Sequence, residues 1–287
     1  MSSTSQLTTY SDLYTDVQNR VRVTTGASAT ETQAKRYINI AIHDFNLGFQ
    51  YKLPWLERTG QLRTHAPYST GTVSISVGST TLAASGSLWV TDNSYGEDNA
   101  RTTGKIVLEG GTDIYPVSTV TDDTTITLGS KYVGSAALSA ATYTYFEDTY
   151  DLATDFLRPL DFQFFSQAYN VELIPRDEFR RRFPRPNVAG RPKYACILDL
   201  APTGNTTPVR RVQFYPYPSE TLVIPYSYIT SAVGVSAAGA ALSSLSSDTD
   251  EPLVPLRYRH AIVYHALYHW YRDKRDDARS QEAKAEY

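Results

Sequence analysis

Apolar residues at helical spacing mark the beginning of the chain. They recur every four positions from Leu13 to Val21, and a second stripe with a 3.6-residue period follows. A capping-box pattern precedes this second stripe, formed by Ser28 with Glu31 or by Thr30 with Gln33. We expect two amphipathic helices, and the apolar face of the second consists of Ala34, Tyr37, Ile38, Ala41, Ile42, Phe45 and Phe49.

The other end of the chain predicts a long closing helix. Acidic residues at positions 248–251 and Pro252 suit the first turn of this helix. The segment before it, residues 230–247, is rich in Ala, Ser and Gly, whose side chains bury little area against the entropy lost on ordering. We therefore expect a flexible loop there. The face of the closing helix is expected to consist of Leu256, His260, Val263, Leu267 and Trp270.

The middle of the chain has the pattern of short strands. From about residue 66 to 147, β-branched runs alternate with Gly, Asn and Asp, which predicts a separate all-β module, a small barrel or sandwich. The strands expected in it are 72–77, 80–83, 105–108, 114–120, 124–128 and 142–146. A second strand-rich region follows, with strands expected at 150–152, 156–160, 194–200, 209–215 and 222–229, the last two paired as a hairpin.

Together these elements predict an α+β protein. The N- and C-terminal helices form a helical bundle frame with a strand-rich middle, and a small all-β barrel or sandwich is inserted into it. The expected domains are 1–65 for the N-terminal helical part of the frame, 66–147 for the inserted module, and 148–287 for the strand-rich region and the C-terminal helix that completes the frame.

Charge is nearly balanced over the whole chain but not locally. The formal net charge is -3, so neither nucleic acid nor an anionic membrane is favoured as a general partner. The module has seven acidic and three basic residues, whereas residues 172–193 have seven basic and three acidic ones. Arginine pairs well with carboxylates and phosphates, so this basic segment is predicted to contact an acidic surface of another subunit or, alternatively, DNA. A solvated loop anchored by Phe179 and Phe183 is the third interpretation. The residues predicted at a subunit interface are Arg180, Arg181, Arg182 and Arg185.

The sequence contains only weak candidates for a metal-binding, catalytic or phosphate-binding motif. His265 and His269 are four residues apart on the closing helix, with His260 nearby, so two imidazoles could reach one metal ion. No carboxylate or cysteine supports them in the sequence, and an ordinary helix surface or interface is the preferred interpretation. Cys196 lies within an expected strand without a neighbouring base, and no phosphate-binding glycine motif occurs. We therefore predict no enzyme activity, no cofactor and no metal.

Two further features concern the setting of the protein. A single cysteine fits folding in a reducing cytoplasm, and we expect neither a signal peptide nor a membrane-spanning segment. Tyrosine occurs 22 times, which suits partly dry interfaces or, equally, strands in a β-rich chain.

The order of these elements resembles the head-to-tail connector proteins of tailed bacteriophages, also called adaptor or neck proteins. The inserted module, with GTVSISVGSTTLAASGSLW near its start, is similar to a module that recurs in phage virion proteins. The segments that carry the resemblance to the connectors are Leu53–Leu56 (LPWL), Tyr150–Leu160 (YDLATDFLRPL), Gly190–Tyr194 (GRPKY), Val212–Pro216 (VQFYP) and the helix expected after Pro255.

This resemblance implies a structural virion protein without catalytic activity. Connectors of this kind form a ring, commonly of twelve copies, beneath the portal, and the ring provides the platform on which tail proteins assemble. The helices are then expected to surround a DNA channel, and a C-terminal segment is expected to dock onto the portal. On this basis we predict a portal or assembly interface that consists of Tyr264, His265, Tyr268, Arg272 and Tyr287.

The resemblance implies four kinds of partner: other copies of this chain in a ring, the portal protein, a tail or tail-nozzle protein, and passing double-stranded DNA without sequence specificity. The resemblance also implies a location in the virion neck, after assembly in the host cytoplasm. It further implies a role in genome ejection. An alternative is a tail or capsid-surface adhesin that binds carbohydrate, because Trp89 and Tyr95 of the module could stack on sugar rings.

Overall fold

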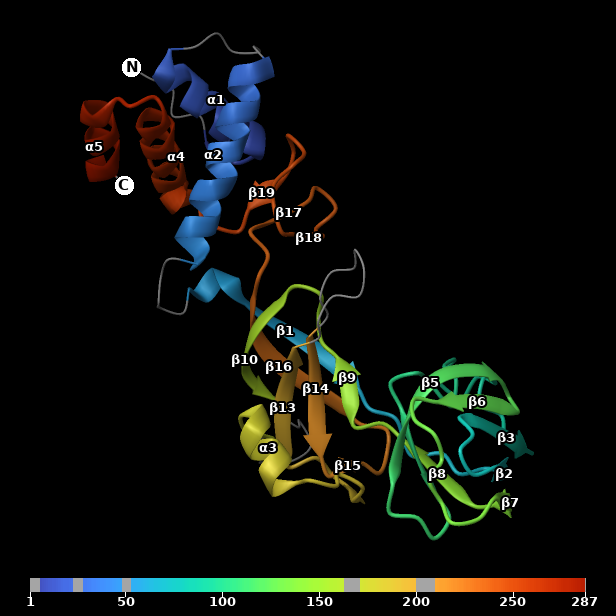
Figure 1. The fold of residues 1–287 in the computed structure, drawn as a ribbon. Coiled ribbons are helices and arrows are strands. Elements are labelled where there is room, and N and C mark those ends of the chain that lie inside the picture. Colours follow the sequence, from blue (N-terminus) through green and yellow to red (C-terminus); the bar gives the residue numbers. More distant parts are fainter. Residues whose placement is uncertain (1–5, 23–27, 48–52, 163–170, 200–209, 287) are drawn as a thin grey trace. The chain divides into compact units, whose positions relative to one another are not determined.

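The computed structural model describes residues 6–22, 28–47, 53–162, 171–199 and 210–286. The chain divides into two compact units (Figure 1). One unit contains Met1–Arg58 and Ile229–Tyr287, and the other contains Thr59–Tyr228. Helices come mainly from the two ends of the chain and strands from its middle, which confirms the predicted α+β class.

Within the described residues, four α-helices form the first unit. α1 begins at a capping box, in which the side chains of Thr9 and Asp12 each accept a hydrogen bond from the other residue's backbone N–H. The predicted stripe of the second helix is confirmed, since Ala34, Ile38 and Ala41 are fully buried, whereas Phe49 lies outside the described residues. The bounds of the helices are α1 Tyr10–Val21, α2 Ser28–Leu47, α4 Arg259–Asp273 and α5 Asp277–Glu286.

The core of the helical unit joins residues from both ends of the chain. Complete burial of each large aliphatic side chain contributes roughly 1.5–3 kcal/mol to folding, so this core requires both the first and the last segments of the chain. Its central members are Leu13, Val17, Ile38, Ile42, Ile262, Val263, Ala266, Leu267 and Trp270.

The Ala/Ser/Gly segment before the closing helix is not the flexible loop that its composition predicts. It forms the short strands β17 Gly234–Val235 and β18 Ala241–Leu242, which make a three-stranded sheet with β19 Glu251–Pro252. Two apolar side chains, Val233 and Leu245, are buried in the helical core. The Asn39 side chain also binds both the N–H and the C=O of Leu245. These buried side chains and hydrogen bonds order the segment, although its remaining residues bury little surface.

The closing helix also begins later than predicted. Residues 248–251 lead into β19, and a 3₁₀ turn at Leu256–Tyr258 precedes α4. Pro252 and Pro255 explain the delay, because proline disfavours helical geometry in the residue before it. A break follows at Lys274–Asp276, where Arg275 adopts a left-handed backbone with φ of 58°, so the predicted single helix is α4 followed by α5.

The strand-rich part of the second unit consists of two main sheets. One has the order β1-β16-β10 and the other β11-β13-β14-β9, and the short helix α3 packs on β13. A 3₁₀ turn at Pro54–Leu56 leads into β1. The bounds are β1 Glu57–Arg63, β9 Thr149–Asp151, β10 Phe156–Phe162, β11 Glu172–Leu173, α3 Arg176–Arg182, β12 Ala189–Gly190, β13 Tyr194–Asp199, β14 Arg210–Tyr215, β15 Tyr217–Pro218 and β16 Val223–Thr230.

The predicted hairpin between the last two of these long strands is wrong. β14 pairs antiparallel with β13, from Tyr194 opposite Tyr215 to Asp199 opposite Arg210, whereas β16 pairs in the other sheet with β1 and β10. The connecting residues of β15 pair with β12, so the chain does not turn straight back after β14.

The inserted module is a seven-stranded sheet with the order β7-β2-β3-β6-β5-β4-β8. β7 and β8 are separated only by Thr142, yet they occupy opposite ends of this order, so the sheet curls until its two edges approach each other. This confirms the prediction of a small barrel-like module. The bounds are β2 Thr72–Ile75, β3 Thr81–Ser85, β4 Lys105–Leu108, β5 Ile114–Asp122, β6 Thr125–Leu128, β7 Leu138–Ala141 and β8 Tyr143–Phe146.

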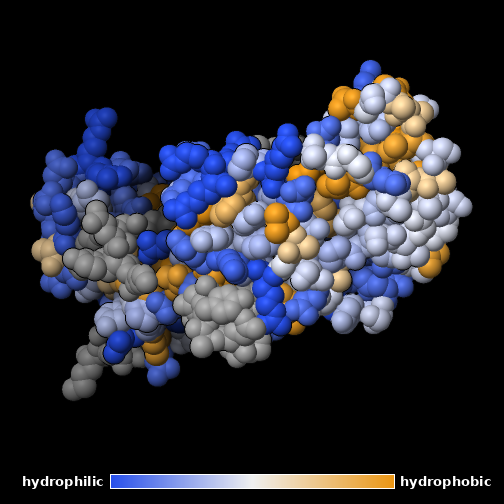
Figure 2. All heavy atoms as spheres, turned by 90° about the horizontal axis from the view of Figure 1, so that it is seen from below, coloured by the Kyte–Doolittle hydropathy of each residue, from blue (hydrophilic) through white to orange (hydrophobic). Residues whose placement is uncertain are grey.

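The module has its own apolar core and a surface of intermediate hydropathy. Trp89 is fully buried in that core, and its indole N–H donates a hydrogen bond of 2.9 Å to the Tyr143 hydroxyl. Figure 2 shows mostly pale residues over the visible face of the module, at the right of the view, as a surface rich in Ser, Thr and Gly should give. Trp89 is therefore not positioned to stack on a sugar, whereas Tyr95 is exposed.

Candidate functional sites

Helix α4 carries most of the residues that were predicted to form an assembly interface. Tyr264, Tyr268 and Arg272 follow one another at intervals of four, so they share one helix face. The Tyr264 hydroxyl accepts a hydrogen bond of 3.1 Å from Arg20, and the Arg272 guanidinium lies 5.3 Å from the centre of the Tyr268 ring. Both tyrosines are half-buried and Arg272 is exposed, while Tyr287 lies outside the described residues.

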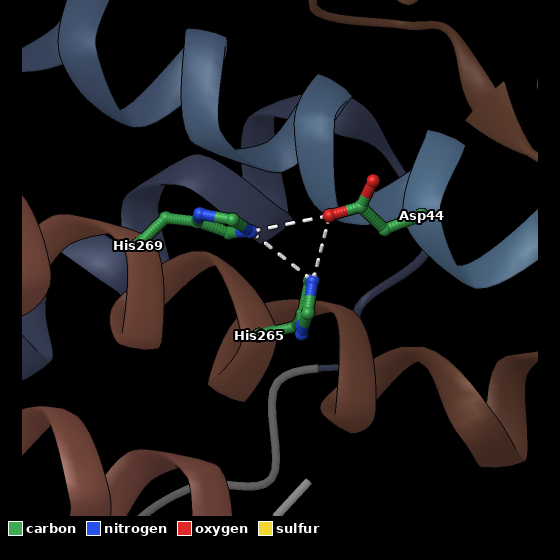
Figure 3. A group of neighbouring side chains, drawn as sticks. All are labelled: Asp44, His265 and His269. Carbon is green, nitrogen blue, oxygen red and sulfur yellow. Dashed lines mark hydrogen bonds and ion pairs between the residues drawn. The ribbon is translucent and has the colours of Figure 1, made fainter. Parts of the chain in front are cut away.

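His265 lies on a different side of α4 and is buried together with His269. Both imidazoles point toward Asp44, which α2 contributes (Figure 3). The Nε2 atoms of His265 and His269 lie 3.0 and 3.2 Å from Asp44 Oδ2, and 3.1 Å from each other. Three possible metal-ligand atoms from two helices thus converge on one point.

Electrostatics distinguish the members of this cluster. Burial alone would raise the pKa of Asp44, but hydrogen bonds from His265 and His269 outweigh it, and the pKa lies below its ordinary value. Burial, followed by the charges of His265 and Arg272, lowers the pKa of His269 despite the opposing effect of Asp44. Near neutral pH, Asp44 is therefore ionised and His269 is neutral.

No carboxylate supports the histidine pair in the sequence pattern, but the structure supplies one, Asp44, from α2. Asp44 precedes His265 by 221 positions, so no local spacing could link them. The sequence indicates only indirectly that Asp44 lies near the packed face of α2. Asp44 stands between Ile42 and Phe45, and both belong to the stripe that packs α2 into the helical core. The group Asp44, His265 and His269 is a candidate metal site.

The basic segment forms the short helix α3 and the residues after it. Phe179 is buried and the Phe183 ring stacks 3.8 Å from the Tyr215 ring, so the predicted aromatic anchors are confirmed. The side chain of Arg182 forms an ion pair with Glu178 one turn earlier. All four arginines predicted at a subunit interface are exposed: Arg180, Arg181, Arg182 and Arg185.

A buried carboxylate fixes the end of the module within its unit. Glu147, which follows β8, is only 3% exposed and accepts hydrogen bonds from Arg101 Nε at 2.8 Å and the Tyr145 hydroxyl at 2.5 Å. Its other oxygen lies 2.9 Å from Nδ1 of His65, whose Nε2 lies 2.9 Å from Glu97. Sequence reasoning missed this network because its members are distributed over more than 80 positions.

The family model described as SU10 adaptor protein matches residues 130–287, which is more than half of the chain. The chain belongs to the SU10 adaptor protein family. No curated protein matches its sequence.

Family membership confirms the resemblance to phage adaptors. The SU10 adaptor family is a structural family, and this member is a bacteriophage virion component that contacts other virion proteins. None of the helices in the described part of the chain combines the length and the hydropathy of a transmembrane span. The matched region contains α3, α4 and α5, and thus the described residues of both predicted interfaces, whereas Asp44 lies outside it.

Proposed function

We propose that this SU10 adaptor forms a ring of twelve copies between the portal of the capsid and the tail. The ring surrounds the channel through which double-stranded DNA leaves the capsid, and it provides the platform on which a tail or tail-nozzle protein docks. The family match over the C-terminal half of the chain is the observation that carries this proposal. Assembly takes place in the host cytoplasm, and the function is structural rather than enzymatic.

The face of α4 is proposed to dock on the portal. Tyr264 and Tyr268 offer apolar rings with polar tips, and Arg272 adds an exposed charge to the same face. Such side chains suit an interface that becomes partly dry on assembly. His265 supports this face from the buried side of the helix. Tyr287, which lies outside the described residues, is proposed to belong to the same interface.

The exposed arginines of the α3 segment are proposed to lie at the boundary between neighbouring copies. The module, which has seven acidic and three basic residues, offers a surface of opposite charge on the neighbouring copy. Opposite local charges on one chain favour a head-to-tail contact, and such contacts repeated around an axis close into a ring. The balanced overall charge of -3 also suits a conduit, because weak attraction lets DNA slide.

Electron microscopy of the portal mixed with this protein tests the proposal. A ring should appear at the narrow end of the portal, with twelve-fold symmetry in class averages. The variant Tyr268→Ala combined with Arg272→Glu should fold but fail to add the ring, whereas His260→Gln, an exposed change on the same helix, should assemble normally. Portals that remain bare with the unaltered protein would refute the proposal.

A further inference from the structure

The contacts among Asp44, His265 and His269 cannot all be hydrogen bonds at once. The three atoms form a triangle with sides of 3.0, 3.1 and 3.2 Å. When Asp44 is ionised, hydrogens can come only from the two Nε2 atoms. If both carry hydrogen, both N–H groups donate to Asp44 Oδ2, and two donors then lie 3.1 Å apart with no hydrogen bond between them. If one carries it, the other Nε2 places a lone pair against the carboxylate oxygen.

A metal ion removes this conflict, because it takes a lone pair from all three atoms. At bond lengths of about 2.0–2.1 Å, an ion equidistant from them would have ligand–metal–ligand angles of roughly 91–106°. These angles lie between octahedral and tetrahedral values, and all three ligands occupy one face of the ion. Two imidazoles and one carboxylate on one face is a recurring ligand set for divalent transition metals.

We propose that Asp44, His265 and His269 form a binding site for one divalent transition metal ion. The site takes two ligands from α4 and one from α2 (Figure 3). The Asp44 side chain is about half exposed, with a relative accessibility of 51%, whereas each histidine side chain is 9% exposed. The remaining coordination positions therefore face solvent on the side of Asp44, where water molecules complete the shell. Borderline nitrogen and oxygen ligands favour Zn²⁺ over Mg²⁺ or Ca²⁺.

Arg272 opposes the metal in a way that can be measured. Its guanidinium donates to Nδ1 of His269 at 3.1 Å, which requires that nitrogen to lack hydrogen. When a metal occupies Nε2 of a neutral imidazole, Nδ1 carries the hydrogen instead, so Arg272 must turn away. Arg272 is exposed and free to do so, but its charge also repels the cation. Its removal should therefore strengthen metal binding.

A metal ion bound at this site would link α2 to α4. α2 and α4 are joined only through tertiary contacts, and Asp44 is 221 positions away from His265. A metal that binds the folded state and not the unfolded chain stabilises the fold by mass action. This inference does not rest on the proposed ring, since one chain supplies all three protein ligands.

The test uses full-length protein, purified without a histidine tag and treated with a chelator, with Zn²⁺ as the probe. Titration calorimetry should show one ion per chain, and thermal unfolding should shift upward until one equivalent is added. Co²⁺ should give the visible absorption of a protein-bound ion. His260→Gln is the matched control, because this exposed histidine of α4 lies outside the cluster and should leave binding unchanged.

Two variants then probe the ligand set. Asp44→Asn keeps the size of a half-exposed side chain, so it should fold, and it should weaken Zn²⁺ binding at least tenfold. Arg272→Gln should strengthen binding several-fold. Absence of stoichiometric binding by the unaltered protein, or equal affinity in Asp44→Asn, would overturn the site. A merely hydrogen-bonded cluster predicts no gain for Arg272→Gln. Circular dichroism of each variant without metal confirms that the helices are retained.

Discussion

Glu147 is a single residue on which much of the second unit depends. Its carboxylate is 3% exposed and is surrounded by Arg101, His65 and Tyr145. Removing one charge from a buried ion pair leaves the other without compensation and costs about 3 kcal/mol or more. Glu147→Gln should therefore lower the free energy of unfolding by about that amount, measured by urea titration with circular dichroism. Glu172→Gln, at an exposed position of β11, should change it by less than about 0.5 kcal/mol.

The same residue predicts how stability depends on pH. Burial would raise the pKa of Glu147, but the hydrogen bond from His65 and the charge of Arg101 outweigh it, so the pKa lies below its ordinary value. A lowered pKa contributes stability above the unfolded value of about 4.3, and this contribution is lost as pH falls through the folded value. Below about pH 4.5, the unaltered protein should thus lose stability more steeply than Glu147→Gln. Parallel slopes would contradict the ion-pair assignment.

At the scale of elements, sequence periodicity predicted what depends on local pattern. The stripe from Ala34 to Phe45 predicted α2, and alternation predicted most strands of the module to within a few residues. Periodicity could not predict which strands pair. β16 pairs with β1, which lies far earlier in the chain, and not with its sequence neighbour β14. The site shows the same division, because the spacing of His265 and His269 was visible whereas Asp44 requires the packing of α2 on α4.

The α3 segment is the element in which the proposed subunit contact can be tested. Reversal of Arg182 would disturb its ion pair with Glu178, so the test leaves it intact. The variant Arg180→Glu, Arg181→Glu, Arg185→Glu should keep the fold but reduce ring formation at least tenfold, measured by mass photometry. The defect should resemble that of high salt, which screens exposed charges. Arg158→Glu, an exposed reversal elsewhere in the unit, should assemble normally. Rings that persist in the triple variant would remove these arginines from the boundary.

At the scale of the whole molecule, the division into two units separates two sets of properties. The helical unit contains the α4 face and the histidine–aspartate site, while the second unit contains both the basic segment and the acidic module. Metal binding should therefore stabilise the first unit, and loss of Glu147 should affect the second. The core of the strand-rich part contains residues such as Leu62, Phe162 and Phe214 but none from 66 to 146, so the module has a core of its own within the second unit.

Whether the module contacts the arginines of a neighbouring copy can be decided by exchanging the charges. Asp92, Asp98 and Asp113 are exposed acids of the module. Asp92→Lys, Asp98→Lys, Asp113→Lys should by itself weaken ring formation as the arginine triple variant does. Combining both sets restores opposite charges across the boundary, so the combined variant should recover rings at low salt, because complementary charges attract in either order. If the arginine and aspartate triple variants each fold without forming rings, and the combined variant also forms no rings, the arginines contact another surface and the module is not their partner.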